Sequence, residues 1–408
     1  MIKENNNSSI NGGGEAKVKE PLFHISKRTI TDKWLPYKTR AIAVAAALIF
    51  CAIVSAIVAK INPFQLFGAM ISGSFGSMRK ILFLLQNMAI LLCISLAVTP
   101  AFKMRFWNIG AEGQVLIGGL ATAACMLCLG PKLPTGILII VMIIASIVAG
   151  AIWGLIPAVC KAYFGTNETL FTLMMNYVAM QLIAYFTTIW ERPKGSGHIG
   201  GIPWGHLPTI GVDYVLNIIL VAIITAVMYI YLKYSKQGYE IEVVGGSENT
   251  ARYIGIDVKR VIIRTMIISS ALCGFAGLLI VAGTDYTITS ESAGGNGFTA
   301  IMVSWLAKFN PIYMILTTFL LVFLQAGAGE IATKFGLNHA FSDILTGIIL
   351  FFIIGCEFFI NYKVVFRHKA TEEANQTTEV ATDKNSEVEK AEETGAEKTE
   401  ETTGGTEK

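Results

Sequence analysis

Apolar residues run along this chain in blocks of about 20 that carry few or no charged residues. The first block, residues 41–59 (AIAVAAALIFCAIVSAIVA), has none. A helix needs about 20 apolar residues to cross the ~30 Å hydrocarbon core of a bilayer. Because such blocks recur to about residue 361, the pattern predicts an all-α, polytopic membrane helix bundle.

We predict about ten transmembrane helices from these blocks. They are expected at 41–59, 81–100, 107–129, 137–160, 169–190, 214–233, 263–282, 288–308, 311–328 and 341–361. The block at 288–308 has three glycines near its start and ends shortly before Pro311. Glycine and proline interrupt helices, so we expect a broken or re-entrant segment there, which a bilayer tolerates only where protein covers the backbone or water lines it.

Composition and charge agree with a membrane location. Hydrophobic residues make up 53% of the chain and charged residues 15%, against about a quarter charged in soluble domains. Lysine and arginine gather before the first span, after the even-numbered spans and after the last one, with Arg79 and Lys80 as exceptions. Since cytoplasmic loops are enriched in these residues, an even number of crossings places both termini in the cytoplasm.

The two ends of the chain differ from the part between them. Residues 1–34 are rich in Asn, Ser and Gly and lack the apolar core of a signal peptide. Residues 367–408 form a Thr-, Glu- and Lys-rich tract that cannot bury enough apolar surface to fold. We therefore predict a disordered cytoplasmic segment at 1–34, a transmembrane domain at 35–366 and a disordered acidic cytoplasmic tail at 367–408.

Polar side chains enter the predicted spans in three places. One cluster opens the third span, the amide of Asn176 lies two turns into the fifth, and Asn296 lies in the glycine-rich segment. An ionisable group such as Glu112 is expensive inside a membrane and is retained where it has partners or a function. The candidates for lining a translocation path are Asn108, Glu112, Gln114, Asn176 and Asn296. Each place also has a structural alternative. The cluster that opens the third span can be a helix cap and packing cluster, Asn176 can form an interhelical hydrogen bond worth about 1 kcal/mol, and Asn296 can lie in a surface loop.

The long cytoplasmic link at 234–262 carries a further candidate site. Ser247 or Asn249 can cap a short helix that Gly255 ends, with Ala251 and Ile254 on its apolar face. Such a helix either lies on the lipid surface or docks in a groove of a cytoplasmic partner, and its brevity favours docking. The candidate docking residues are Gly246, Glu248, Asn249, Ala251, Arg252, Gly255 and Ile256.

Several chemistries lack their motifs in this sequence. No GxxxxGK[ST] phosphate loop or H-E-x-x-H zinc motif occurs, and the seven cysteines show no metal-ligand spacing. We therefore expect no enzyme activity, metal or cofactor on this chain and no nucleic-acid partner. A pore driven by a separate subunit fits better than a secondary transporter or a ten-span scaffold, which remain the alternatives.

Four motifs in order resemble the permease subunits of bacterial ABC importers of the ribose, branched-chain amino acid and nucleoside class. They are N-I-G-A-E-G-Q at 108–114, G-S-E-N with A-R-Y-I-G-I at 246–256, S-S-A-L-C-G-F-A-G at 269–277 and G-N-G-F at 295–298. The likeness covers about residues 40–365. The phrase T-N-E-T-L-F-T-L-M-M-N-Y at 166–177 is most similar to the nucleoside permeases.

The resemblance implies a nucleoside substrate delivered by an extracellular binding lipoprotein, with ribose or branched-chain amino acids as alternatives. It implies a multi-pass protein of a bacterial plasma membrane, with two related halves and lipid around it. It also implies a second permease subunit, identical or related, and a cytoplasmic ABC ATPase that binds ATP-Mg. Segment 245–257 is expected to be the coupling helix seated on that ATPase.

Overall fold

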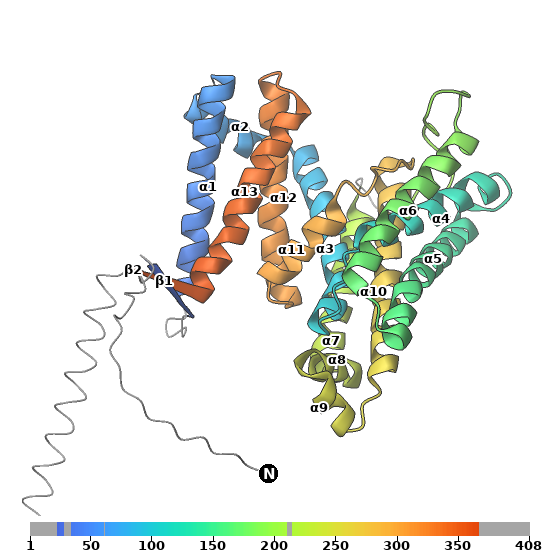
Figure 1. Ribbon diagram of the computed structural model, residues 1–408. Helices are drawn as coiled ribbons and strands as arrows, with labels where there is room; N and C mark the ends of the chain where they lie inside the picture. Colours follow the sequence, from blue (N-terminus) through green and yellow to red (C-terminus); the bar gives the residue numbers. More distant parts are fainter. Residues whose placement is uncertain (1–22, 28–33, 61, 210–213, 367–408) are drawn as a thin grey trace, which may run out of the picture. The chain divides into compact units, whose positions relative to one another are not determined.

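The computed structural model describes residues 23–27, 34–60, 62–209 and 214–366, most of which are helical (Figure 1). The helices are α1 (Leu35–Ala59), α2 (Pro63–Phe75), α3 (Met78–Lys103), α4 (Ala111–Leu129), α5 (Thr135–Phe164), α6 (Glu168–Trp190), α7 (Val215–Tyr234), α8 (Lys236–Gly246), α9 (Glu248–Tyr253), α10 (Val258–Ile280), α11 (Asn296–Leu306), α12 (Pro311–Lys334) and α13 (His339–Asn361). A π-helical segment, η1 (Val281–Asp285), continues α10, and two strands are β1 (Phe23–Lys27) and β2 (Tyr362–Phe366). The prediction of an all-α bundle is confirmed.

Two compact units divide the chain. One is Val44–Ile354, and it contains every residue of the sites described below. The other combines Met1–Ala43 with Gly355–Lys408, and its described part holds the ion pair of Arg40 with Glu357 at 2.6 Å. The predicted segment 1–34 contributes β1, while its residues 1–22 and 28–33, and the predicted tail 367–408, lie outside the described residues.

Nine of the described helices are long and apolar enough to cross a membrane: α1, α3 to α7, α10, α12 and α13. The tenth predicted span, at 288–308, was expected to be broken or re-entrant, and that stretch contains the 11-residue α11. Gly294 and Gly295 precede α11 with φ of 58° and 73°, a left-handed conformation that glycine adopts without steric cost. At 1.5 Å per residue α11 spans about 16 Å, roughly half the hydrocarbon core. The predicted broken segment is thus a half-length helix.

The two described strands join the start of α1 to the end of α13. Strands β1 and β2 pair antiparallel, with Phe23 opposite Phe366 and Lys27 opposite Tyr362. Because β1 precedes α1 and β2 follows α13, the start of α1 and the end of α13 lie at the same end of their unit.

Helix α2 lies between the first two predicted spans, where the hydrophobic pattern predicts no element. Its 13 residues begin at Pro63, and the side chain of Asn62 accepts a hydrogen bond from the amide of Phe64 at 3.1 Å. An asparagine cap followed by proline is a frequent start of a helix. The helix is too short to cross a bilayer.

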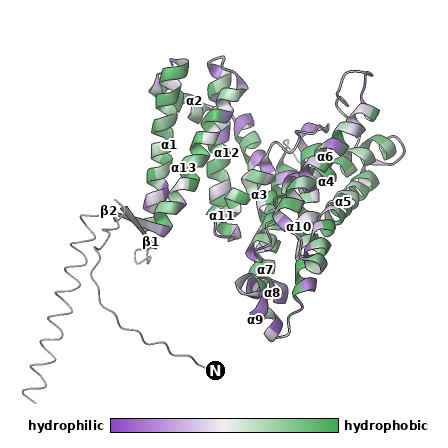
Figure 2. Cartoon of the chain, in the orientation of Figure 1, coloured by the Kyte–Doolittle hydropathy of each residue, from purple (hydrophilic) through white to green (hydrophobic). Residues whose placement is uncertain are grey.

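Hydrophobic residues follow one another along the long helices, as Figure 2 shows by the green colour of α1 and α5. The exposed residues of α5 recur every three or four positions, which is one face of a helix. They are Ile137, Ile140, Ile144, Val148, Ile152 and Ile156. In water such an exposed apolar stripe would favour aggregation, so its presence agrees with a lipid surrounding.

Helix α10 packs against α3, α4 and α5 at distances that only small residues permit (Figure 1). A methyl group added at Gly274 would overlap with the carbonyl oxygen of Ser146 on α5, and one at Gly118 on α4 would overlap with the backbone of Gly274. Lipid offers no hydrophobic drive for association, and small residues allow the close backbone contact that replaces it. These glycines therefore fix the core of the 44–354 unit.

The loop after α6 folds back over the end of α10. Backbone amides of Ile202 and Leu207 donate to the carbonyl oxygens of Tyr286 and Ala282 at 2.8 and 3.0 Å. At the start of this loop, the Glu191 carboxylate accepts hydrogen bonds from the amides of Gly195 and Gly197 at 2.7 and 3.0 Å. These two amides, and secondarily Lys194, lower the pKa of the Glu191 carboxyl.

We expect this loop to loosen in acid. Because the pKa of Glu191 is lower in the folded loop than in an unfolded chain (about 4.3), its stabilisation is complete above the unfolded value and is lost as the pH falls through the folded one. Hydrogen exchange of the Gly195 and Gly197 amides, corrected for intrinsic rates, should lose protection across that interval. Glu191→Gln should show weak protection at every pH. Equal protection of both proteins at pH 7 would contradict the assignment.

Candidate functional site

Two amide side chains hold the turn between α3 and α4. Asn108 and Gln114 form a reciprocal pair, with both N–H···O contacts at 3.2 Å, and Asn108 Oδ1 also accepts from the amide of Gly110 at 3.1 Å. Both side chains are buried. Asn108 thereby satisfies the amide of Gly110, which precedes the first turn of α4, where backbone amides have no partner inside the helix.

Helix α6 contacts the same turn through two polar side chains. Asn176 donates to the carbonyl oxygen of Ile109 at 3.0 Å and accepts from the amide of Gly113 at 2.9 Å. Thr172 accepts from the amide of Ile109 at 3.2 Å. A side chain at Gly113 would collide with the Asn176 amide, whose Oδ1 lies 2.8 Å from the position of an added Cβ. Glycine at 113 thus permits the contact between α4 and α6.

The Glu112 carboxylate caps the half-length helix α11. Its Oε1 accepts from the amide of Gly295 at 2.8 Å, and its Oε2 accepts from the amide of Gly297 at 2.7 Å. The side chain is only 3% exposed. A carboxylate at a helix N-terminus satisfies free amides and is favoured by the helix dipole. A Cβ at Gly297 would overlap with the backbone nitrogen of Glu112, so glycine is required there.

Four of the five predicted path residues therefore form one buried network. Asn108, Glu112, Gln114 and Asn176 join the α3–α4 turn, α6 and the start of α11. Their contacts match the structural alternative of a helix cap and packing cluster. A role in lining a path stays a prediction for these four residues.

The fifth, Asn296, lies in a cavity of about 690 Å³ beside α3 and α12. Lys80 and Glu330 form an ion pair of 2.7 Å across it, and Lys80 also donates to the carbonyl oxygen of Ser72. The polar and aromatic residues of its lining are Arg79, Lys80, Phe83, Asn87, Tyr214, Asn296, Gln325, Glu330 and Thr333. Volumes of 300–1,000 Å³ are usual for small-molecule sites.

Asn296 was predicted from the sequence as a path residue, whereas the two other amides of this cavity were not predicted. Asn87 and Gln325 each stand inside an apolar block that was predicted to span the membrane. Their position within a span could have identified them as candidate path residues, because polar residues within spans are uncommon. Which face of its helix each amide occupies emerges only from packing.

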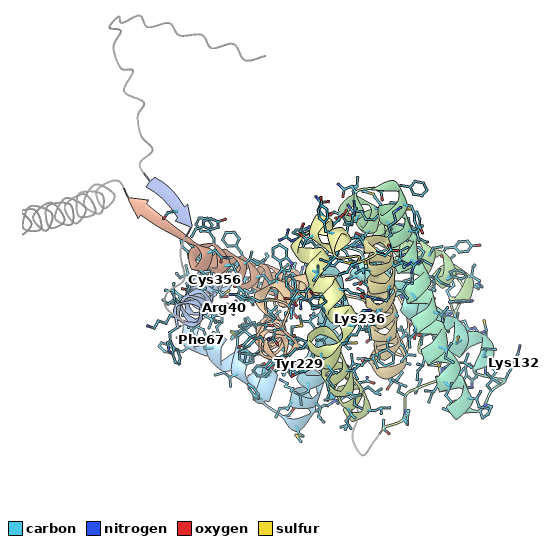
Figure 3. All side chains as sticks on the ribbon, turned by 90° about the horizontal axis from the view of Figure 1, so that it is seen from below. Arg40, Phe67, Lys132, Tyr229, Lys236 and Cys356 are labelled. Atoms are coloured by element: carbon cyan, nitrogen blue, oxygen red, sulfur yellow. The ribbon has the colours of Figure 1, made fainter. Side chains whose placement is uncertain are left out.

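The predicted cytoplasmic link at 234–262 contains α8 and α9. Lys236, which Figure 3 labels, is the first residue of α8. Ser247 caps α9 by accepting from the amide of Thr250, and Gly255 ends the turn after it with φ of 83°. Both features agree with the prediction. Lys103 of α3 bonds to Glu242 at 2.9 Å, and Arg264 of α10 bonds to Glu240 at 2.8 Å. The link is thereby fastened to two long helices.

Most of the predicted docking residues are exposed to solvent, but one of them is buried. Gly246, Glu248, Asn249, Arg252 and Gly255 are exposed, and Ile256 is half-buried. Ala251 is fully buried against the ends of α3 and α10, so it holds the segment in place. The predicted apolar face is split, because Ile254 points outward, 55% exposed. Tyr253, which was not predicted, is 92% exposed at the end of α9.

Comparison with known proteins points to transport. Residues 80–354 match the family described as branched-chain amino acid transport system / permease component. The chain is 29% identical to the guanosine ABC transporter permease protein of Bacillus subtilis, over 70% of this chain and 84% of that one. It is 28% identical to the nucleoside ABC transporter permease protein of Lactococcus lactis (78% and 91%) and 26% identical to the glucose ABC transporter permease protein of Haloferax volcanii (84% and 93%).

Proposed function

Because the chain belongs to the family of branched-chain amino acid transport system / permease components, we propose that it is the membrane-spanning subunit of an ATP-driven importer of nucleosides. The likeness to the guanosine and nucleoside permeases, over most of both chains, is the observation that carries the choice of substrate. The cavity beside α3 and α12 supports it, since amides and aromatic rings line it.

The remaining assembly follows from the same proposal. ATP is hydrolysed on a separate cytoplasmic ATPase, and a lipoprotein delivers the nucleoside from outside. A second permease chain, identical or related, completes the path through a bacterial plasma membrane. We propose ten passes, with α11 as the short one, and both termini and the α8–α9 link on the cytoplasmic side.

Coupling runs from the link into the long helices. Movement of the ATPase displaces α8 and α9, and the ion pairs Lys103–Glu242 and Arg264–Glu240 transmit the displacement to α3 and α10. Helix α3 also carries Lys80 and Asn87 into the cavity near its other end. A ligand or partner can shift such an equilibrium only by contacts that differ between the two states. Those ion pairs and the Lys80–Glu330 pair are the contacts that change.

Tyr253 tests the docking surface. Tyr253→Ala removes a side chain that is 92% exposed at the end of α9, so the permease itself should fold without it. We expect ATP-driven transport to fall at least about tenfold, the effect of losing roughly 1.4 kcal/mol of contact with the ATPase. Membrane levels should stay unchanged. Tyr313→Ala, on a half-exposed face of α12, is the control.

A pull-down of the ATPase by each variant completes that measurement. Reduced capture by Tyr253→Ala and normal capture by Tyr313→Ala is the expected pair of results. Full transport and full capture by Tyr253→Ala would remove α9 from the ATPase interface.

Uptake of labelled nucleosides tests the function itself. Cells that lack this chain should lose energy-dependent nucleoside uptake and regain it when the chain is restored. Unlabelled ribose, glucose and leucine should not compete. Loss of sugar or leucine uptake instead would keep the family and overturn the substrate.

A further inference from the structure

The cavity beside α3 and α12 contains three amide side chains that come from three helices. Asn87 lies on α3, Asn296 begins α11 and Gln325 lies on α12. All three are half-buried. Within the described part of the chain, none of the three side chains has a hydrogen-bond partner, whereas Asn108, Gln114 and Asn176 all do. Each of the cavity amides therefore offers a donor and an acceptor to a solute.

The other walls suit a flat and partly apolar solute. Phe83 and Tyr214 supply aromatic rings, and Leu84, Ile90 and Val322 supply aliphatic surface. Rings stack on planar groups, and stacking on a nucleobase is worth about 1–3 kcal/mol per base. A cavity that combines such surfaces with a few convergent polar groups fixes the orientation of what it binds.

The charges of the cavity favour an uncharged solute. Glu330 neutralises Lys80 at 2.7 Å. The amides at the start of α11, which would otherwise attract an anion, are occupied by the Glu112 carboxylate. Arg79 remains at the cavity as one cation without an ion pair among the described residues. One exposed guanidinium is a poor substitute for the clusters that recognise phosphate.

We infer that Asn87, Gln325 and Asn296 recognise the hydrogen-bonding edge of an uncharged nucleobase after delivery, so that the permease itself selects its substrate. The inference rests on the proposed function. Asparagine and glutamine amides pair with base edges through a donor and an acceptor at once. A site built to form such bonds rejects a solute that lacks them, because its own polar groups are then left unpaired.

The experiment uses the full permease with its ATPase in proteoliposomes and saturating loaded lipoprotein. Saturation removes differences in delivery, so the maximal uptake rate reports on the permease. The solutes are labelled guanosine, labelled purine riboside, which lacks the exocyclic groups of guanine, and labelled guanosine monophosphate. The variants are Asn87→Leu, Gln325→Met and Asn296→Leu, each close in size to the residue replaced.

We expect each variant to lower the guanosine rate about tenfold. This factor corresponds to about 1.4 kcal/mol, near the upper end of the net contribution of one hydrogen bond. The purine riboside rate should change little, whereas a purely structural defect would lower both rates alike. Gln181→Met, an exposed amide on α6 outside the cavity, should leave both rates unchanged.

The outcomes separate the two proposals. No uptake of either nucleoside by the unaltered protein, with uptake of a sugar or an amino acid instead, would overturn the proposed function. Normal guanosine uptake by the unaltered protein and by all three variants would overturn only the recognition site. Equal loss for both nucleosides, or faster uptake of the monophosphate than of guanosine, would also overturn it.

Discussion

Glu112→Ala should abolish transport and destabilise the protein. The carboxylate is buried and is the acceptor for the amides of Gly295 and Gly297. Its removal leaves two amides without a partner at the start of α11, at about 1–3 kcal/mol each. The expected loss is therefore about 2–6 kcal/mol. Because α11 begins with Asn296, the cavity loses one of its walls as well.

Thermal unfolding in detergent and uptake in cells together measure this effect. Glu112→Gln keeps one acceptor oxygen, so it should fall between the unaltered protein and the alanine variant. Glu291→Gln changes an exposed carboxylate a few residues before α11 and should change neither quantity. Normal stability and uptake in Glu112→Ala would show that α11 does not depend on this cap.

Gly274→Ala should prevent the 44–354 unit from assembling. The added methyl group overlaps with the carbonyl oxygen of Ser146 and lies against Gly150, and both neighbours are helix backbone that cannot rotate away. Overpacking of a core usually costs 1–3 kcal/mol, and backbone neighbours place this substitution at or above the upper end. Helices α5 and α10 must separate to admit it.

The matched variant is Gly347→Ala in α13, where no described atom beyond the adjoining backbone of its own helix lies within 4 Å of the added methyl group. Alanine is the better helix former by about 1 kcal/mol, so this variant should be neutral or slightly more stable. The yield of monodisperse protein after detergent extraction distinguishes the two. Equal yields from both variants would contradict the close contact of α10 with α5.

Hydrophobic length predicted nine of the long helices from the sequence, and their boundaries differ from the structure by several residues. At 288–308 apolar length alone could not give the length of the helix, and the glycines of the sequence indicated the break that the structure has at Gly294 and Gly295. Helix α2 is apolar but shorter than a span. The β1–β2 pair joins segments more than 300 residues apart, which no local pattern encodes.

The site was predicted as a set of residues and not as a set of contacts. A glutamate and four amides in or beside apolar segments stood out because polar groups are costly there. That Glu112 reaches Gly295 and Gly297, and that Asn176 reaches Ile109, depends on how distant helices pack. For the same reason Ala251 was grouped with the docking residues, although its side chain is buried beneath them.

The most direct test of ATP-driven nucleoside import uses this chain and its ATPase in proteoliposomes with a loaded lipoprotein outside. Accumulation of labelled nucleoside inside should require ATP on the ATPase side and should continue when ion gradients are collapsed. Accumulation that does not require ATP and depends on an ion gradient would contradict ATP-driven import, because the chain would then be a secondary transporter.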